Sequence, residues 1–201
     1  RVQDASMGYF ITPMISIVLG YFFLNEKITK PKFASVCFML SGILFLFINL
    51  NQFPFLIIWI GTSWAIYGLL RKQVNVNPPI GLLYETLIIS LISTPYLVYL
   101  FWQNENSIFS IDLKTSLFLI LTGAVTIFPL LFFNLGLKFI QLGLAGVLFY
   151  LAPTFHFITS VFILNEEILQ IKLISFIIIW IGIIIYIYDS YKKEIILNNT
   201  Q

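Results

Sequence analysis

The chain contains an internal repeat whose two copies are 140 residues apart. Residues 5–43 align without a gap with residues 145–183, and Pro13 of the first copy matches Pro153 of the second. A Leu-Asn-Glu tripeptide occurs at the same place in both copies. Similarity at a fixed offset is the signature of a duplicated structural unit. The sequence therefore predicts two copies of one unit, with the end of that unit present in each copy.

The composition indicates a membrane protein. Hydrophobic residues make up 59% of the chain and charged residues 10%, which leaves too few polar groups for a water-exposed surface. A helix needs about 20 predominantly apolar residues to cross a bilayer. The runs of about that length lie at residues 8–24, 33–50, 53–70, 80–102, 115–137, 142–164 and 173–191. They lack the alternation of a spanning strand, so we expect an all-α integral membrane fold with seven transmembrane helices.

The positions of lysine and arginine predict the orientation. Short loops rich in these residues stay in the cytoplasm. One side receives Lys27, Lys30, Lys32, Arg71, Lys72, Lys138, Lys192 and Lys193. The other side receives only Arg1, Lys114 and Lys172, together with most of the acidic loop residues. The sequence therefore predicts a multi-pass protein of the bacterial inner (cell) membrane with a cytoplasmic C-terminus.

This orientation places the two Leu-Asn-Glu turns on opposite faces of the membrane, so the repeat is predicted to be inverted. Copies of a unit can oppose each other only if the unit has an odd number of helices, and the offset spans five. Residues 1–50 would then be the last two helices of the first unit, residues 53–191 a complete second unit, and residues 192–201 a cytoplasmic tail. We expect three further helices, within about 87 residues, before Arg1. The alternative is a complete seven-helix protein whose helices resemble each other by coincidence.

Four motifs carry a resemblance to a known family. They are Gly8-Tyr9-Phe10-Ile11-Thr12-Pro13, Tyr67-Gly68-Leu69-Leu70-Arg71-Lys72, Glu85-Thr86-Leu87 and Val125-Thr126-Ile127-Phe128-Pro129-Leu130-Leu131. Together they resemble the RarD subfamily of the EamA branch of the drug/metabolite transporter superfamily. The resemblance implies a ten-helix (5+5) inverted-repeat transporter, of which this chain would be an N-terminally truncated part. It also implies cytoplasmic termini and a central pathway between the repeats.

Several polar and aromatic residues are candidates for the substrate pathway, because aromatic walls with a few polar anchors suit a small amphipathic solute. These residues lie on helices that resemble the cavity-lining helices of the family: Tyr9, Thr12, Trp64, Tyr67, Thr126, Asn134 and Tyr150. In a chain with 17% aromatic residues, packing or lipid contact is the competing interpretation for each of them.

Prolines inside the predicted helices are candidate hinges, because a proline frees the carbonyl group four residues earlier. Pro13 and Pro153 occupy equivalent places in the two repeats, and Pro129 lies within the run 115–137. A hinge at these positions would let the two halves exchange conformations. The alternative is a packed kink whose freed carbonyl is satisfied by a neighbouring group.

Glu85 and His156 are the candidates for proton coupling. Ionisable groups within apolar runs are costly and therefore suggest function, and the ordinary pKa of histidine suits proton transfer. For Glu85 the alternative is a structural ion pair with Arg71 or Lys72, and for His156 it is a hydrogen bond within the packed helices.

The sequence offers no motif for a prosthetic group, a metal or catalysis. It lacks a zinc-protease His-Glu-x-x-His motif, a Gly-x-Ser-x-Gly motif and a phosphate-binding loop. We therefore expect a permease that moves a small organic solute by alternating access, without cofactor, metal ligands or catalytic residues. Its partners would be the lipid bilayer and the solute, with a homodimer left open and no nucleic acid. A non-transporting membrane scaffold or sensor is the alternative function.

Overall fold

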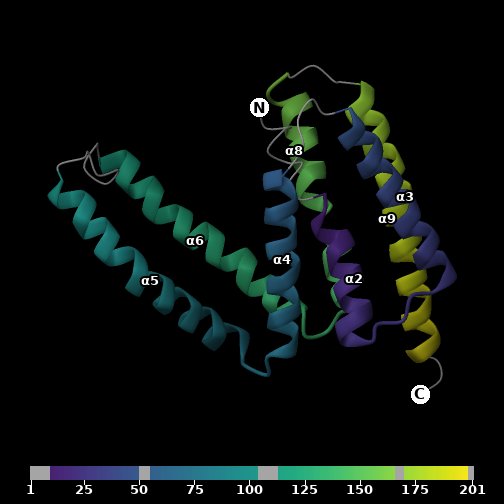
Figure 1. Ribbon diagram of the computed structural model, residues 1–201, viewed down its shortest axis with the longest axis horizontal. Coiled ribbons are helices and arrows are strands. Elements are labelled where there is room, and N and C mark those ends of the chain that lie inside the picture. The colour runs from purple at the N-terminus through teal and green to yellow at the C-terminus, as the bar shows by residue number, and fades with distance from the viewer. Residues whose placement is uncertain (1–9, 50–54, 104–112, 166–169, 199–201) are drawn as a thin grey trace. The chain divides into compact units, whose positions relative to one another are not determined.

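A computed structural model describes residues 10–49, 55–103, 113–165 and 170–198, and all regular structure in them is α-helical (Figure 1). The helices are α2 (Thr12–Leu24), α3 (Lys30–Ile48), α4 (Phe55–Gln73), α5 (Pro78–Trp102), α6 (Leu113–Gly136), α7 (Leu142–Leu148), α8 (Leu151–Phe162) and α9 (Gln170–Asn198). The predicted all-α fold is confirmed.

Five helical segments are long and apolar enough to cross a membrane, with α7 and α8 taken together as one. The shorter apolar helix α2 has 13 residues. The 19-residue α4 ends in Arg71, Lys72 and Gln73, which lower its mean hydropathy. Each of the hydrophobic runs predicted from the sequence is thus found as helix in the described residues. The chain is a multi-pass membrane protein.

The chain divides into two compact units. The first contains residues 1–72 and 140–201, and therefore α2, α3, most of α4, α7, α8 and α9. The second contains residues 73–139, where α5 and α6 contact each other as a helical hairpin. Prolines interrupt the hydrogen bonding inside both hairpin helices, at Pro95 and Pro129. The packing described next belongs to the first unit.

Helices α3 and α9 lie side by side and run in opposite directions (Figure 1). Gly42 lets α9 approach α3 closely. A Cβ atom at this glycine would lie 2.7 Å from Ile179 Cγ1 and 3.0 Å from the carbonyl oxygen of Ser175. Small residues at a helix crossing allow the two backbones to approach closely. In a membrane this close packing drives helix association, because transfer of apolar side chains from lipid to protein gains little free energy.

Gly182 makes the reciprocal contact. Its Cβ atom would lie 2.7 Å from Met39 Cγ and 2.7 Å from the carbonyl oxygen of Ser35. At an offset of 140 residues, Gly182 corresponds to Gly42, Ile179 to Met39 and Ser175 to Ser35. The two contacts therefore use equivalent residues with their roles exchanged. An interface in which equivalent residues exchange places is two-fold symmetric. The two copies of the repeat therefore pack against each other as an inverted pair.

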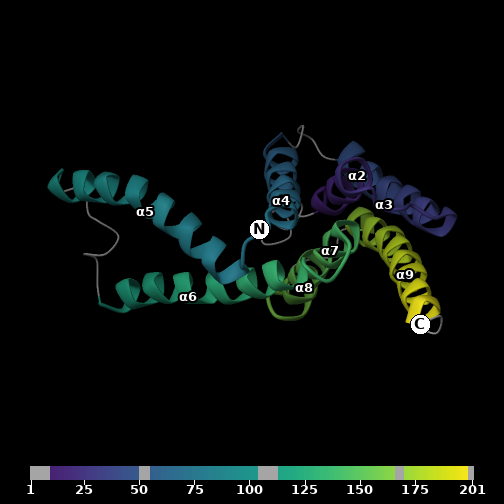
Figure 2. The same ribbon diagram turned by 90° about the horizontal axis from the view of Figure 1, so that it is seen from below.

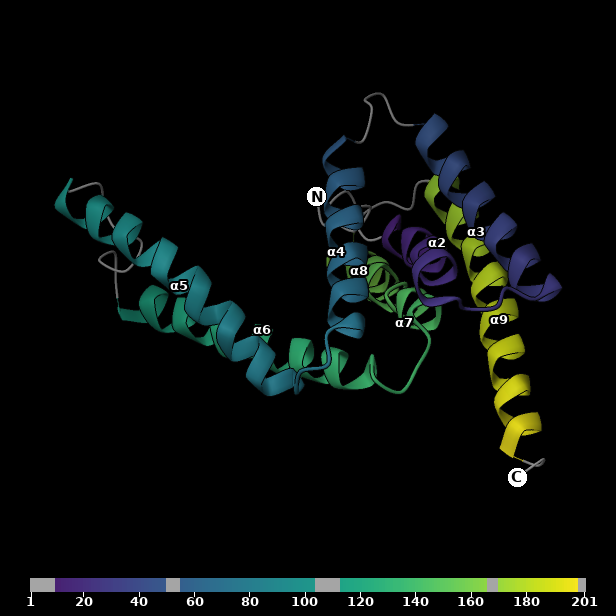
Figure 3. The ribbon, with the colours of Figure 1, turned by 60° about the horizontal axis from the view of Figure 1, so that its bottom comes forward.

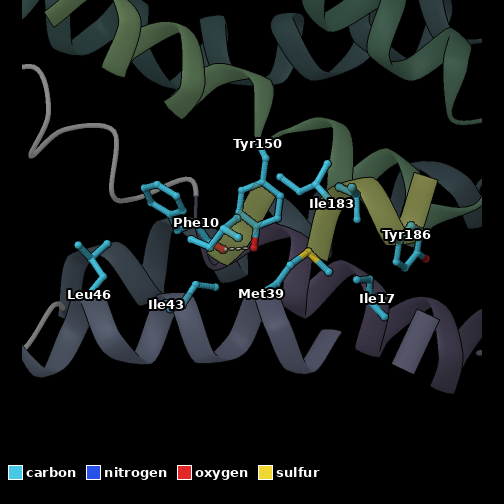
Figure 4. Packing of buried hydrophobic residues seen from close by; sticks show 10 residues of the cluster. Phe10, Ile17, Met39, Ile43, Leu46, Tyr150, Ile183 and Tyr186 are labelled. Atoms are coloured by element: carbon cyan, nitrogen blue, oxygen red, sulfur yellow. Dashed lines mark hydrogen bonds between the residues drawn. The ribbon is translucent and has the colours of Figure 1, made fainter. Parts of the chain in front are cut away.

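The core of this unit lies on the same local symmetry axis. Tyr150 is the repeat equivalent of Phe10, and the two rings contact each other with centroids 6.0 Å apart. The Tyr150 hydroxyl donates to the Phe10 carbonyl oxygen at 3.0 Å (Figure 4). Around them lie Met39 and Ile43 of α3 and other buried side chains of α9. Equivalent residues of the two copies thus meet at the centre of the core.

The Leu-Asn-Glu turns share a backbone conformation. Asn25 and Asn165 are the non-glycine residues with positive φ in the described chain, at 53° and 51°. Asparagine tolerates this left-handed conformation better than most residues, and it ends helices there. At the first turn the Glu26 N–H donates to the Gly20 carbonyl oxygen at 3.0 Å, which closes the end of α2. The repeated tripeptide is therefore a repeated helix terminus.

Candidate functional site

The run predicted as one helix over residues 142–164 is broken in the structure. Helix α7 ends at Leu148 and α8 begins at Leu151 (Figure 2). At the break Phe149 N–H donates to Gly146 and Tyr150 N–H to Val147, both across three residues rather than four. Phe149 and Tyr150 keep right-handed helical backbone angles, so the break is a single tighter turn, of the kind that often marks a hinge within a helix. This break is the starting point for the candidate site.

Pro153 lies in the first turn of α8, immediately after the break. A proline at that place loses no helical hydrogen bond, because the first amides of a helix have no partner. The Phe149 carbonyl oxygen, which we expected Pro153 to release, accepts the Ala152 N–H at 3.1 Å. Pro13 likewise lies in the first turn of α2. The expectation of mid-helix kinks at these two prolines is therefore corrected, since both mark helix starts.

Aromatic residues of α4 pack beside the break. The Trp64 ring lies 5.9 Å from the Phe149 ring and 5.6 Å from the Tyr67 ring, measured between centroids. The Arg71 guanidinium lies 5.9 Å from the centroid of Tyr67. Two of the predicted pathway residues, Trp64 and Tyr67, are thus in contact, and both side chains are half-buried.

Thr12 lies close to the same part of α4. A Cβ atom at Gly61 would lie 3.2 Å from the Thr12 amide nitrogen, and Trp64 follows Gly61 by one turn. The Thr12 side chain is 1% exposed, and its hydroxyl has no hydrogen-bond partner in the described part of the chain. A buried hydroxyl without a partner is costly, so Thr12 stays a predicted polar anchor of the pathway.

Tyr150 lies in the core rather than along an open wall. It is 2% exposed, and its hydroxyl is used by the Phe10 carbonyl. Its own carbonyl accepts both the Thr154 hydroxyl at 2.7 Å and the Thr154 amide at 3.2 Å. The Trp180 indole N–H donates to the same Thr154 hydroxyl at 3.1 Å. Tyr150 is therefore tied to the start of α8, and its contact with a solute stays a prediction.

The remaining predicted residues are spread over both units. Tyr9 lies outside the described residues. In the second unit, Thr126 is exposed on α6 and bonds the Thr122 carbonyl, Asn134 is buried on α6, and Glu85 is half-buried on α5. His156 is half-buried on α8 in the first unit. The structure brings together Thr12, Trp64 and Tyr67 around α4, whereas the roles of the other residues stay predictions.

A polar cluster that the sequence reasoning missed lies at the start of α7. The Glu26 carboxylate accepts the N–H groups of Leu142 and Gly143, the latter at 3.0 Å. These amides are among the four at a helix N-terminus that have no partner within the helix. Glu26 entered the sequence reasoning only as a marker of the repeat. Its place directly after a helix end was the available signal for a capping role.

Two lysines hold the residues before α7. Lys32, which is 2% exposed, donates from Nζ to Gln141 Oε1 at 2.7 Å and lies 4.8 Å from the centre of the Tyr186 ring. Lys72 Nζ donates to the Ile140 carbonyl oxygen. Burial lowers the pKa of Lys72, which lies beyond the apolar run of α4, and the Glu26 charge acts in the opposite direction.

The α2–α3 turn is joined to α9 at the same end. Thr29 caps α3 by accepting the Lys32 N–H at 3.2 Å, and its hydroxyl donates to Asp189 Oδ2 at 2.7 Å. Asp189 of α9 thereby holds the α2–α3 turn. Within the described residues there is no cluster of three or more metal-binding side chains.

Comparison with known proteins identifies the family. A family model described as EamA-like transporter family matches residues 53–188. An uncharacterized transporter of Vibrio cholerae is 31% identical over 96% of this chain and 64% of its own length. Protein RarD of Escherichia coli is 30% identical over 94% of this chain and 64% of its own length. The uncharacterized transporter YojE of Bacillus subtilis is 31% identical over 94% of this chain and 63% of its own length.

The chain thus spans just under two thirds of the length of these relatives. The resemblance predicted from the four motifs is confirmed by relatives that bear the RarD name. The chain belongs to the EamA-like transporter family, and within that family it is similar to the RarD proteins.

Proposed function

We propose that the full-length protein is an inner-membrane permease that moves a small organic metabolite or drug by alternating access between two inverted repeats. The reciprocal crossing of α3 and α9 carries this proposal, because equivalent residues of the two copies exchange places there. Two similar halves related in this way can adopt each other's conformation, which would open a site to either side in turn. The family relationship supports the same interpretation.

The proposed solute site lies beside the break between α7 and α8. Trp64 and Tyr67 supply aromatic surface, and the Thr12 hydroxyl is available as a hydrogen-bond donor or acceptor. Such a mixture suits a solute with an apolar body and few polar groups. Tyr9, Thr126, Asn134 and Tyr150 complete the proposed pathway, and Pro13, Pro129 and Pro153 remain its proposed hinges.

Flux through the full-length protein in proteoliposomes tests this function. The panel holds amino acids, other small metabolites and amphenicol-type drugs, each followed by its appearance inside the vesicles. Trp64→Ala should lower the flux of the transported solute by up to about tenfold, since aromatic contacts contribute about 0.5–1.5 kcal/mol. Trp102→Ala is the matched control, because Trp102 is 81% exposed at the end of α5. Equal flux in both variants would remove Trp64 from the site.

The same assay tests the alternatives. A scaffold or sensor would move no solute of the panel at all, and an enzyme would release a modified one. Glu85→Gln and His156→Ala test proton coupling through the response of flux to an imposed pH gradient. If both variants keep the full response, neither residue couples protons to transport. A reporter fused after Gln201 tests the proposed cytoplasmic C-terminus.

The hinge proposal has its own test. Pro153→Ala and Pro13→Ala should slow flux by more than they lower the folded yield. Each proline lies in the first turn of a helix, where the proposed hinge would act. A loss of yield equal to the loss of flux would assign these prolines to folding alone.

A further inference from the structure

Helix α7 is a short segment that is held differently at its two ends. At its C-terminal end the amides of Phe149 and Tyr150 bond across three residues, in the tighter turn that separates α7 from α8. Its N-terminal end is held by Glu26, which accepts the first two N–H groups of the helix. A seven-residue segment between a break and a side-chain contact can turn about the break only if that contact is released. Release of the Glu26 contact is therefore one condition for movement of α7.

The contact joins the two copies of the repeat. Glu26 follows α2 in the first copy, whereas α7 lies in the second, and the two helices pack along their length (Figure 3). Gly143 and Gly146 of α7 allow this packing, since a Cβ atom at Gly146 would lie 2.6 Å from Ser16 Cβ. Separation of the copies at this end must therefore break the bonds of Glu26.

The groups around Glu26 converge on the same four residues, 140–143. Lys72 of α4 bonds the carbonyl of Ile140, and Lys32 of α3 bonds Gln141. The Tyr186 hydroxyl of α9 lies 2.5 Å from the position of a Cβ atom at Gly143. Four elements that are distant in sequence thus close over the start of α7.

The hydrogen bonds of Glu26 can shift the equilibrium between a closed and an open state of this end of the protein. Hydrogen bonds to a carboxylate are stronger than those between neutral groups, and the N-terminus of a helix attracts negative charge. A contact shifts a two-state equilibrium only by the difference it makes between the states. Because the Glu26 bonds cannot survive separation of α2 from the start of α7, their net free energy relative to the hydrated groups favours the closed state.

We propose that Glu26 is a gate residue, whose contact with the amides of Leu142 and Gly143 closes this end of the solute pathway. Opening of this end requires α7 to leave Glu26 and turn about the break at Phe149 and Tyr150. The inference rests on the proposed transport function and adds to it the residue that holds one of the two alternating states.

Accessibility of a buried thiol tests the gate. Ile17 is 4% exposed, and its Cγ1 atom lies 3.3 Å from the position of a Cβ atom at Gly143. Movement of α7 would uncover it. In the full-length protein, Ile17→Cys is introduced after all native cysteines, Cys37 among them, are replaced by serine. A small charged methanethiosulfonate reagent is then added to either side of sealed vesicles, and the labelling rate is measured.

Glu26→Gln should raise the labelling rate of Ile17→Cys about tenfold from one side only, the change expected for the loss of one charge-assisted hydrogen bond. Lys27→Gln is the matched control, because Lys27 is the next residue, is exposed, and also loses one charge. Its labelling rate should equal that of the parent. Equal rates for the Glu26 and Lys27 variants, with both proteins folded, overturn the proposal.

Gly143→Ala is the second variant, and it leaves Glu26 unchanged. The added methyl group would conflict with the Tyr186 hydroxyl, so it should also favour the open state and faster labelling. If Glu26→Gln fails to fold, this variant decides alone, and a rate at or below that of the parent overturns the proposal.

Failure of the gate and failure of the transport function are distinguishable, because labelling requires no transported solute. Faster labelling without flux of any solute supports the gate and rejects the permease. Flux that persists while labelling is unaffected by Glu26→Gln rejects the gate and leaves the permease.

Discussion

Gly182→Ala would place a methyl group where α9 crosses α3. The methyl carbon would lie 2.7 Å from the Ser35 carbonyl oxygen and 2.7 Å from Met39 Cγ, where 3.4–4 Å is ordinary contact. The Ser35 oxygen belongs to the backbone, which cannot rotate away as a side chain can. The two helices must therefore separate by several tenths of an ångström, and the contacts along the whole crossing weaken.

The expected loss of stability follows from two opposing terms. Overpacking of this kind costs about 1–3 kcal/mol, whereas alanine in place of a helical glycine returns up to about 1 kcal/mol. We expect a net loss of about 1–2 kcal/mol in the free energy of unfolding. Gly123→Ala is the control, because its methyl group meets nothing within 4 Å in the described residues. The control should be unchanged or more stable.

Reversible unfolding of the full-length protein in mixed micelles, followed by circular dichroism, measures this difference. The reasoning about the crossing is wrong if Gly182→Ala is at least as stable as Gly123→Ala. Gly42→Ala should cost less than Gly182→Ala, because the backbone oxygen of Ser175 lies 3.0 Å from the added methyl carbon at Gly42, whereas that of Ser35 lies 2.7 Å from the one at Gly182. The double variant should cost less than the sum of the two, because helices already separated by one methyl group accommodate the second.

Further substitutions test the packing around the break and the turn. Tyr150→Phe should lower the free energy of unfolding by about 1 kcal/mol, because it leaves the Phe10 carbonyl without its donor; an unchanged value contradicts that bond. Thr29→Ala should cost about 1 kcal/mol through the lost helix cap, and Asp189→Asn should cost less than Thr29→Ala if the cap dominates. Gly146→Ala should lower the thermal midpoint, and Ser16→Gly should restore part of it, because the conflict is with the Ser16 side chain; no rescue contradicts that geometry.

Much of the fold could be predicted because the membrane imposes simple requirements on a sequence. A spanning helix must be about 20 apolar residues long, so hydropathy alone locates the helices. The repeat then predicts that equivalent residues have equivalent structure, and the left-handed Asn25 and Asn165 agree with that.

The break between α7 and α8 was not predictable from hydropathy, because its residues are as apolar as the helices on either side. The sequence predicts Pro153 as a hinge inside a continuous helix, with a packed kink as the alternative. Whether the chain bends or stops before a proline depends on what the freed groups contact, and here the Phe149 carbonyl bonds within a tight turn. Local sequence does not contain that information.

The candidate site could be predicted only in part, for the same physical reason. Trp64 and Tyr67 of α4 contact each other, as residues of one pathway wall would. Tyr150 instead lies in the core, where its hydroxyl donates to the Phe10 carbonyl oxygen. Lipid and protein interior are both apolar, so the sequence of a membrane helix carries little information on which face packs.

The sequence by itself therefore determined the all-helical membrane class, the duplication, the helix positions and the family motifs. Only the tertiary structure decided that Gly42 and Gly182 cross reciprocally, that Phe10 meets Tyr150, and that Glu26 holds the start of α7. The first set depends on hydropathy and spacing along the chain, because a bilayer requires apolar segments of a set length. The second set depends on contacts between residues more than a hundred positions apart. Which residues make these contacts is determined by how closely the helix backbones can pack and by which amides lack a partner within their own helix.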